Sequence, residues 1–221
     1  MTEPLDAVIW DFGGVLTTSP FEAFNDYEAE KGLPRDFIRS VNARNGDTNA
    51  WALLERSDID ADAFDQLFAE ESQALGHDVP GKDVLALLAG RIRPAMVEAL
   101  KACKSQCKVG CITNNAPIGE GAGMSRDTKS ATAVRSVFSL FDHVIESSKI
   151  GLRKPDPRIY ALMCEALDVE PARCIYIDDL GINLKPARAM GMTTIKALNE
   201  AQILDDLAAA TPFLIRRTAK S

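Results

Sequence analysis

The sequence predicts an α/β fold: a parallel sheet with helices on both faces and an inserted helical segment. Short apolar runs rich in Val and Ile alternate with amphipathic helical patterns, which is typical of parallel strands joined by crossover helices. Between Leu16 and Arg93 the alternation stops, because helical patterns follow one another without a convincing strand. With 221 residues, 46% of them apolar, the chain is long enough to bury such a core.

Five segments have the composition of buried parallel strands, being short, apolar and β-branched. They are Ala7–Trp10, Lys108–Thr113, His143–Glu146, Cys174–Ile177 and Thr193–Lys196. Helical patterns separate most of them, at Pro94–Gln106, Pro155–Leu167 and Asn183–Met190. This order predicts crossover connections that cover both faces of one sheet.

The segment after the first strand predicts a small helical domain. Pro20–Lys31 carries aromatic residues at three-residue spacing and stops at Gly32, a common helix terminator. Asp60 can cap a further helix, whose apolar stripe starts at Phe64. We therefore expect a parallel-sheet core formed by residues 1–17 and 91–221 and a helical cap formed by residues 18–90.

Trp51 has two interpretations within this cap. Residues 45–49 before it are polar and turn-like, so the indole could face the cleft between cap and core and contact a substrate. An aromatic residue in a helical insert can equally pack into the interior of that insert. Both alternatives stay open from the sequence.

A glycine-rich segment, residues 116–127, follows the second expected strand. It superficially resembles a dinucleotide-binding loop, but the GxGxxG spacing is absent and Glu120 would repel a pyrophosphate. We expect a mobile surface loop instead.

Composition excludes several classes of partner. The net charge is −7 and the basic residues are scattered, so nucleic acid is a poor partner. Neither a run of roughly 20 apolar residues nor a signal-like N-terminus is present, which predicts a cytoplasmic protein without a membrane span. The five cysteines include no CxxC pair, so we expect buried thiols rather than disulfides or a zinc site.

Polar residues lie at or just beyond several expected strands, where open α/β sheets place their ligands. They are Asp11, then Thr113, Asn114 and Asn115, then Lys154, then Asp178 and Asp179. Each has an ordinary structural explanation when taken alone. The paired acids could cap the helix near Asn183, and Lys154 could offset a negative surface.

Taken together and in this order, these residues resemble the haloacid dehalogenase superfamily over nearly the whole chain. Within it, the chain is most similar to the group that holds the N-terminal phosphatase domain of soluble epoxide hydrolase and similar domains fused to acyl-CoA dehydrogenases. The segments Gly151–Tyr160 and Asp178–Arg188 carry this likeness. The resemblance implies a Rossmann-like core, which is an α/β parallel sheet with helices on both faces, and a helical cap inserted after the first strand. It also implies Mg²⁺-dependent attack of Asp11 on a phosphoryl group.

The chemistry of the acidic residues agrees with that mechanism. A carboxylate nucleophile at Asp11 splits hydrolysis into formation and breakdown of an aspartyl phosphate. Asp178 and Asp179 offer hard oxygen ligands of the kind that Mg²⁺ binds. Lys154 would supply a fixed cation, which a site with three carboxylates needs before it can accept a phosphate dianion.

The remaining candidates would hold and orient these groups. Thr113, with the backbone N–H groups of Asn114 and Asn115, would bind the transferring oxygens, because phosphoryl transfer depends mainly on positioning and charge neutralisation. Asn183, one turn past the paired acids, would orient them from behind.

Gly13 departs from the family pattern. The family usually has an Asp there, whose side chain protonates the leaving group and later activates water while its main-chain carbonyl binds the metal. Gly13 keeps the carbonyl but loses general acid–base catalysis, which is typically worth about 10²–10⁴ in rate. Asp47 and Glu55 of the cap are candidates to replace it.

Three functions are compatible with this pattern. The first is a phosphatase that acts on a small phosphorylated metabolite with Mg²⁺. The second is a 2-haloacid dehalogenase-like hydrolase, because halide leaves without a proton, although those relatives need no metal. The third is a catalytically impaired regulatory domain that keeps a phosphate and metal pocket. The substrate and the oligomeric state stay open.

Overall fold

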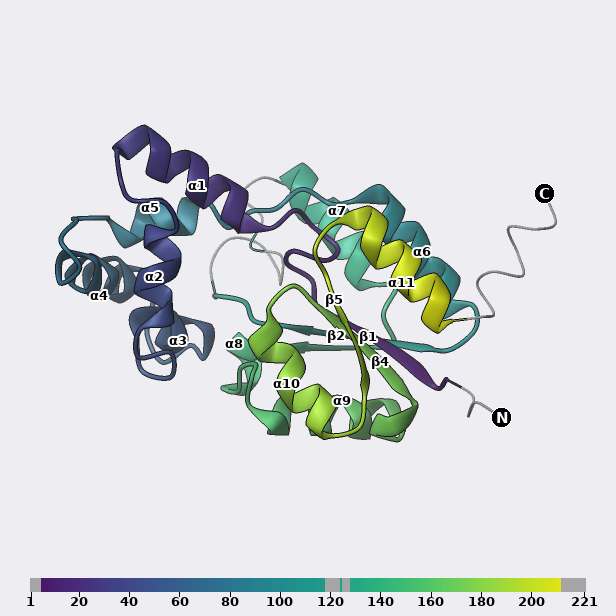
Figure 1. Cartoon of the computed structure of the whole chain (residues 1–221). Coiled ribbons are helices and arrows are strands. Elements are labelled where there is room, and N and C mark those ends of the chain that lie inside the picture. Colours follow the sequence, from purple (N-terminus) through teal and green to yellow (C-terminus); the bar gives the residue numbers. More distant parts are fainter. Residues whose placement is uncertain (1–4, 118–123, 125–127, 212–221) are drawn as a thin grey trace.

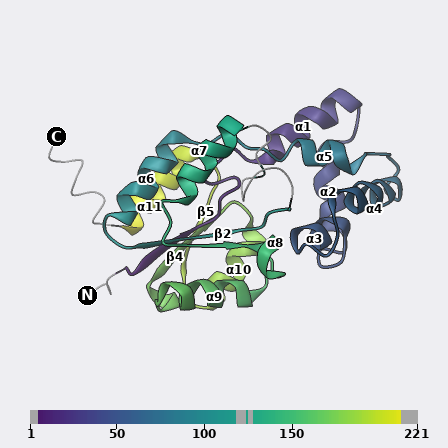
Figure 2. The ribbon, with the colours of Figure 1, turned by 180° about the vertical axis from the view of Figure 1, so that it is seen from behind.

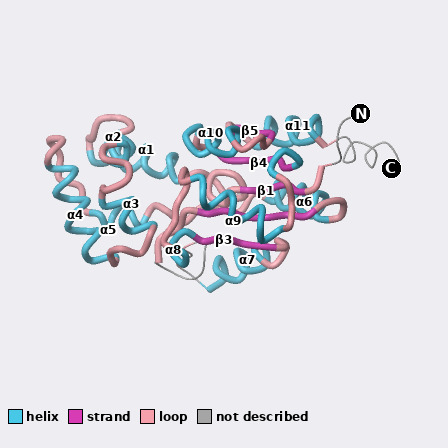
Figure 3. The backbone as a smooth tube through the Cα atoms, turned by 90° about the horizontal axis from the view of Figure 1, so that it is seen from below, coloured by secondary structure: helices cyan, strands magenta, loops and turns pink. Residues whose placement is uncertain are grey.

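The computed structural model describes residues 5–117, 124 and 128–211, and its centre is a five-stranded parallel sheet of order β3-β2-β1-β4-β5. The strands are β1 (Ala7–Trp10), β2 (Lys108–Thr113), β3 (His143–Glu146), β4 (Cys174–Asp178) and β5 (Thr193–Lys196). Figure 3 shows them side by side, with β1 in the interior of the sheet. The predicted α/β fold class is confirmed.

Helices cover both faces of the sheet (Figure 1). One layer contains α6 (Pro94–Lys104), α7 (Thr128–Phe138) and α11 (Glu200–Ala210), and the other contains α8 (Ser147–Ile150), α9 (Pro157–Leu167) and α10 (Gly181–Ala189). Successive side chains of a strand point to opposite faces, so Val8 and Trp10 pack under the first layer while Ala7 and Ile9 pack under the second. Burial on both faces explains why β1 is apolar throughout.

The core helices start and stop close to the predicted positions. The helix predicted from Pro155 begins at Pro157, because the Asp156 side chain accepts from the Arg158 N–H at 2.9 Å and caps it. The helix predicted from Asn183 begins two residues earlier, at Gly181.

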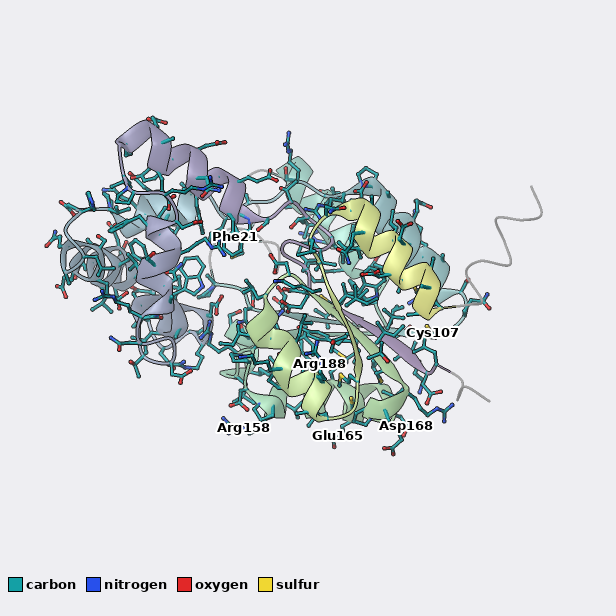
Figure 4. All side chains as sticks on the ribbon, viewed as in Figure 1. Phe21, Cys107, Arg158, Glu165, Asp168 and Arg188 are labelled. Carbon is teal, nitrogen blue, oxygen red and sulfur yellow. The ribbon has the colours of Figure 1, made fainter. Side chains whose placement is uncertain are left out.

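The second unit is a cluster of five helices beyond the carboxyl ends of the strands, seen from two sides in Figures 1 and 2. They are α1 (Pro20–Lys31), α2 (Phe37–Ala43), α3 (Ala50–Glu55), α4 (Ala61–Gln73) and α5 (Gly81–Ala86). Phe24, Phe64 and Phe68 are buried at its centre. Phe21, labelled in Figure 4, lies at the end of α1 that joins the core. This cluster buries its own apolar surface, as an inserted domain must.

The chain leaves and re-enters the core through two paired linkers. The Thr18 N–H donates to the Arg91 carbonyl at 2.8 Å, and the Arg93 N–H donates to the Leu16 carbonyl at 2.9 Å. Thr17 and Ile92 form an antiparallel bridge between them. We propose residues 18–90 as the cap on this basis and use that name below.

Several expectations from composition can be compared with the structure. All five cysteines are unpaired and all but Cys107 are buried, and Cys107 lies at the end of the core far from the cap (Figure 4). Among the described residues, no helix has both the length and the hydrophobicity that crossing a bilayer requires. The loop predicted to be mobile, residues 116–127, falls mostly outside the described residues.

Candidate active site

Three strand ends meet at one point of the sheet. Asp11 follows β1 directly, and its N–H donates to the Ile177 carbonyl of β4 at 2.8 Å. Trp10 is in register with Cys111 of β2 on one side and with Ile177 on the other. Parallel pairing therefore brings the residues after β1, β2 and β4 to the same edge, which faces the cap (Figure 1).

Asp11, Asp178 and Asp179 form a carboxylate cluster at this edge, with one oxygen from each lying within 4.8 Å of the others. The Lys154 Nζ lies 2.8 Å from Asp11 Oδ1 and 2.9 Å from Asp178 Oδ2, with only 1% of its side chain exposed. One ammonium among three carboxylates leaves an excess of negative charge in a buried place. The donor set therefore fits a hard divalent cation such as Mg²⁺.

Burial and mutual repulsion perturb the ionisation of these groups. Burial raises the pKa of Asp11 well above its usual range; Lys154 opposes that rise, and Asp178 and Asp179 add to it. Burial, followed by the charge of Asp178, raises the pKa of Asp179 to about 6. Burial would lower the pKa of Lys154, but the attraction of Asp11 and Asp178 outweighs it and the pKa is raised.

Asp178 is the fully buried member of the cluster, and protein donors occupy both its oxygens. Oδ2 accepts from Lys154 at 2.9 Å and from the Tyr176 hydroxyl at 2.5 Å. Oδ1 accepts from the Leu180 N–H at 2.8 Å, and the Asn183 amide lies 3.1 Å from both oxygens. A carboxylate has about four acceptor positions, so these donors fill Asp178.

Asp179 lies in different surroundings, against the glycine turn that follows β1. Gly14 has φ +74°, and a Cβ at that residue would lie 2.2 Å from Asp179 Oδ2. Only glycine therefore permits this close approach of the two turns. A Cβ at Gly13, in contrast, would have nothing within 4 Å.

The three predicted phosphate-binding residues differ in the contacts that they already make within the protein. Thr113 is buried at the end of β2. The Asn114 side chain pairs with the main chain of Lys154, donating to its carbonyl at 3.0 Å and accepting from its N–H at 2.8 Å. The Asn115 N–H already donates to Ser147 Oγ at 3.0 Å, so the substrate contact predicted for it would require that bond to break.

Three cap residues complete the comparison with the sequence. The Trp51 ring packs edge-on against Phe64 at 5.7 Å in the cap interior, and its Nε1 donates to Glu55 Oε1 at 2.9 Å. The structure thus favours the packing alternative for Trp51. Glu55 is buried and contacts the core, whereas Asp47 is exposed. Asp47 lines a hollow of about 470 Å³ with Arg153, on a part of the surface that none of the three clustered acids lines.

Tyr176 and Ser19 contact the acid cluster, although neither residue is predicted from the sequence. Tyr176 lies two residues before Asp178 on β4, so the strand period of two could have placed both side chains on one face. Ser19, whose Oγ lies 3.5 Å from Asp179 Oδ2, also caps α1, and that structural role gave no separate signal.

Residues 5–191 match the family model for haloacid dehalogenase-like hydrolases. The chain belongs to this family.

Curated relatives fall into two groups by length. Mouse acyl-CoA dehydrogenase family member 10 and mouse bifunctional epoxide hydrolase 2 are each 30% identical over 94% of this chain, which spans only 19% and 39% of their lengths. A phosphatase of Mycobacterium tuberculosis is 32% identical over 197 residues, covering 85% of each chain. This last relative has the size of the present chain.

Solved structures agree with the fold. A haloacid dehalogenase family enzyme of Bacteroides thetaiotaomicron, in complex with magnesium and inorganic phosphate, aligns with TM-score 0.59 and 18% identity over 90% of this chain and 98% of its own. L-2-haloacid dehalogenase of Xanthobacter autotrophicus, with chloropropionic acid covalently bound, gives TM-score 0.59 and 19% identity over 97% and 88%. At these identities the likeness concerns the fold.

Proposed function

We propose that this hydrolase is a Mg²⁺-dependent phosphatase that acts on a small phosphate ester through an aspartyl phosphate on Asp11. The observation that carries the proposal is the buried Lys154 ammonium within 2.9 Å of Asp11 and Asp178, beside a third carboxylate. Such a site pairs an anionic nucleophile with the fixed cation that a phosphate dianion requires. The relative from M. tuberculosis and the phosphate complex of the B. thetaiotaomicron enzyme support it.

Asp11 is oriented for nucleophilic attack by two hydrogen bonds to one oxygen. Oδ1 accepts from Lys154 Nζ at 2.8 Å and from the Phe12 N–H at 2.7 Å, which fixes the plane of the carboxylate. In the first step an Asp11 oxygen bonds to phosphorus, and the bond from phosphorus to the ester oxygen breaks. In the second step water cleaves the aspartyl phosphate and regenerates Asp11.

Among the predicted metal ligands, we propose that Asp11, Asp179 and the Gly13 carbonyl bind Mg²⁺ directly. Asp178 belongs to the same cluster, but its oxygens are filled by protein donors, so its role is to hold Lys154 and Asn183 in place. When bound, Mg²⁺ would neutralise charge on the transferring oxygens.

The absence of a carboxylate at Gly13 points to a class of leaving group. An alkoxide needs a proton to depart, whereas an aryloxide or enolate of low pKa does not. The open space beside Gly13 leaves the leaving-group side of the site without a fixed acid from this turn. We therefore infer that esters of acidic alcohols are the better substrates.

Release of phosphate from an aryl phosphate tests this function. We expect Mg²⁺-dependent turnover by the wild type, none after chelation of the metal, and none in Asp11→Asn, which keeps the shape but removes the nucleophile. If the wild type shows no turnover above Asp11→Asn across a broad panel of esters, the phosphatase proposal fails. A regulatory domain that binds metal and phosphate would then be the better account.

One observation favours a second candidate, a 2-haloacid dehalogenase-like hydrolase. Halide departs without a proton, so Gly13 would cost such an enzyme nothing. The full acid cluster argues for a metal and hence for phosphate. Metal-independent release of chloride from 2-chloropropionate would reverse this preference.

A further inference from the structure

Glu55, at the end of α3, is a buried carboxylate of the cap that lies against the core, with 7% of the residue exposed. Its two oxygens accept from three donors. Oε2 accepts from Arg153 Nε at 2.6 Å and from Asn114 Nδ2 at 3.1 Å, both in the core. Oε1 accepts from Trp51 Nε1 at 2.9 Å, within the cap. Glu55 thus joins the two units of the molecule.

Both core donors are linked to Lys154. Asn114 forms two hydrogen bonds to the main chain of Lys154, one to its N–H and one to its carbonyl. Arg153 is its chain neighbour and also donates from NH1 to the Gly46 carbonyl of the cap at 2.8 Å. A cap carboxylate therefore fixes the segment whose side chain supplies the buried cation of the site.

We propose that Glu55 is a positioning residue for Lys154, through which docking of the cap sets the place of the catalytic cation. This inference rests on the proposed function, because it concerns the same site. With the cap docked, Glu55 holds the Asn114 amide in the orientation that forms both hydrogen bonds to the main chain of Lys154. With the cap displaced, Asn114 loses this acceptor and its two hydrogen bonds to Lys154 become weaker. Substrate would then meet a complete site only under a docked cap.

The contacts also show that Glu55 does not replace the acid missing at Gly13. Both oxygens of Glu55 act as acceptors, from a guanidinium at 2.6 Å, an indole and an amide. A proton donor needs a free O–H directed at the leaving group. The role of Glu55 is therefore in placement rather than in proton transfer.

The chain offers a matched control in a neighbouring contact between cap and core. Ser57 follows α3, and its hydroxyl donates to the Ser148 carbonyl at 2.7 Å. Ser57 and Glu55 both tie α3 to the core beside α8, but the Ser57 contact does not pass through Asn114 or Lys154. Ser57→Ala weakens docking alone, whereas Glu55→Gln weakens docking and placement together.

Glu55→Gln is the informative substitution because glutamine has one acceptor oxygen for donors on two sides. Whichever way the amide turns, its NH₂ group faces a donor: Trp51 on one side, or Arg153 and Asn114 on the other. We expect the Lys154 N–H, followed by NMR hydrogen exchange without substrate, to exchange at least about tenfold faster in Glu55→Gln. Ser57→Ala should leave this rate within about twofold of wild type.

Activity on an aryl phosphate gives the second measurement. We expect kcat to fall about tenfold in Glu55→Gln with KM changed less, because Lys154 acts on the charge that develops in the transition state. The double variant Trp51→Phe/Glu55→Gln should recover part of both losses. Without the indole donor, the single glutamine oxygen is free to turn toward Asn114 and Arg153.

Each outcome separates this inference from the proposed function. Unchanged exchange at Lys154 in Glu55→Gln, an equal change in Ser57→Ala, or no recovery in the double variant would overturn the role of Glu55. Faster exchange in Glu55→Gln together with an inactive wild type would overturn the phosphatase proposal and leave the link from Glu55 to Lys154 intact.

Discussion

The core and the cap contribute to the site in different ways. The acids of the core sit at strand ends, and Asp178, the fully buried one, accepts from Lys154, from the Tyr176 hydroxyl and from the Leu180 N–H. The cap contributes Glu55 from α3, a helix of six residues, and the contacts of Glu55 with Asn114 and Arg153 depend on α3 lying against the core. The sheet therefore assembles the charges of the site, while the cap adjusts where one of them lies.

The core should be more sensitive to substitution than the cap. Lys154→Met tests this expectation and should have the largest effect. Lys154 is the one cation among the described residues that pairs with Asp11 and Asp178, and removing it should lower kcat by about 10³ or more. It should also lower the free energy of unfolding by about 3–5 kcal/mol, because buried carboxylates lose their partner.

Urea denaturation with and without Mg²⁺ separates these effects. Added metal should restore part of the stability of Lys154→Met but not its activity. A stability equal to wild type would show that the buried ion pairs matter less to the core than we argue.

Gly13→Asp should change the reaction rather than the fold. A Cβ at this position has nothing within 4 Å, so the first atom of the new side chain meets no obstacle. We expect turnover of alkyl phosphates to rise by up to about 10² and that of aryl phosphates by much less, because only alkoxides need the added acid. The ratio of kcat/KM for an alkyl ester to kcat/KM for a matched aryl ester, compared between the variant and the wild type, measures this change of preference. Equal gains for both esters would mean that the new carboxylate acts in the second step, on the water that cleaves the aspartyl phosphate, and not on the leaving group.

Gly14→Ala should disturb the contact between the two turns. The added Cβ would collide with the Asp179 carboxylate at 2.2 Å and would strain a residue at φ +74°. We expect Mg²⁺ affinity to fall about 10–100-fold, measured by calorimetry, because Asp179 must move away from Asp11. Gly13→Ala is the control, and an equal loss in that variant would contradict the steric argument.

The smallest effect is expected in the cap, far from the acid cluster. The Tyr27 hydroxyl of α1 donates to Asp83 of α5 at 2.9 Å, and burial together with this carboxylate raises the pKa of Tyr27 to about 12. Tyr27→Phe should cost about 1 kcal/mol of stability at neutral pH and leave kcat unchanged.

The same residue gives a pH dependence with a definite sign. The unfolded chain loses the Tyr27 proton near pH 10 and the folded chain near 12, so the contribution of Tyr27 to stability is complete below pH 10 and declines between the two values. In Tyr27→Phe this part of the alkaline decline should be absent from denaturation curves. A loss of kcat in this variant would show that packing within the cap reaches the site.

The contrast between core and cap also explains which parts of the site could be predicted from the sequence. Asp11 and Asp178 were predictable because apolar runs mark the strands and parallel strands end at one edge. The division of labour between Asp178 and Asp179 was not, since it depends on which carboxylate meets Lys154 and Tyr176 and which meets Gly14. The sequence marks Glu55 only as a candidate to replace the missing acid. Its role as an acceptor depends on how α3 docks, and no local pattern encodes that docking.

The paired linkers at Thr17 and Ile92 have an evolutionary consequence. Because the two linkers that lead into and out of the cap are hydrogen-bonded to each other, the cap begins and ends at points about 5 Å apart. Any helical unit with adjacent ends could be exchanged at this junction without altering the sheet. Selection can therefore replace the substrate-facing unit as a module while Asp11 and its neighbours stay in place.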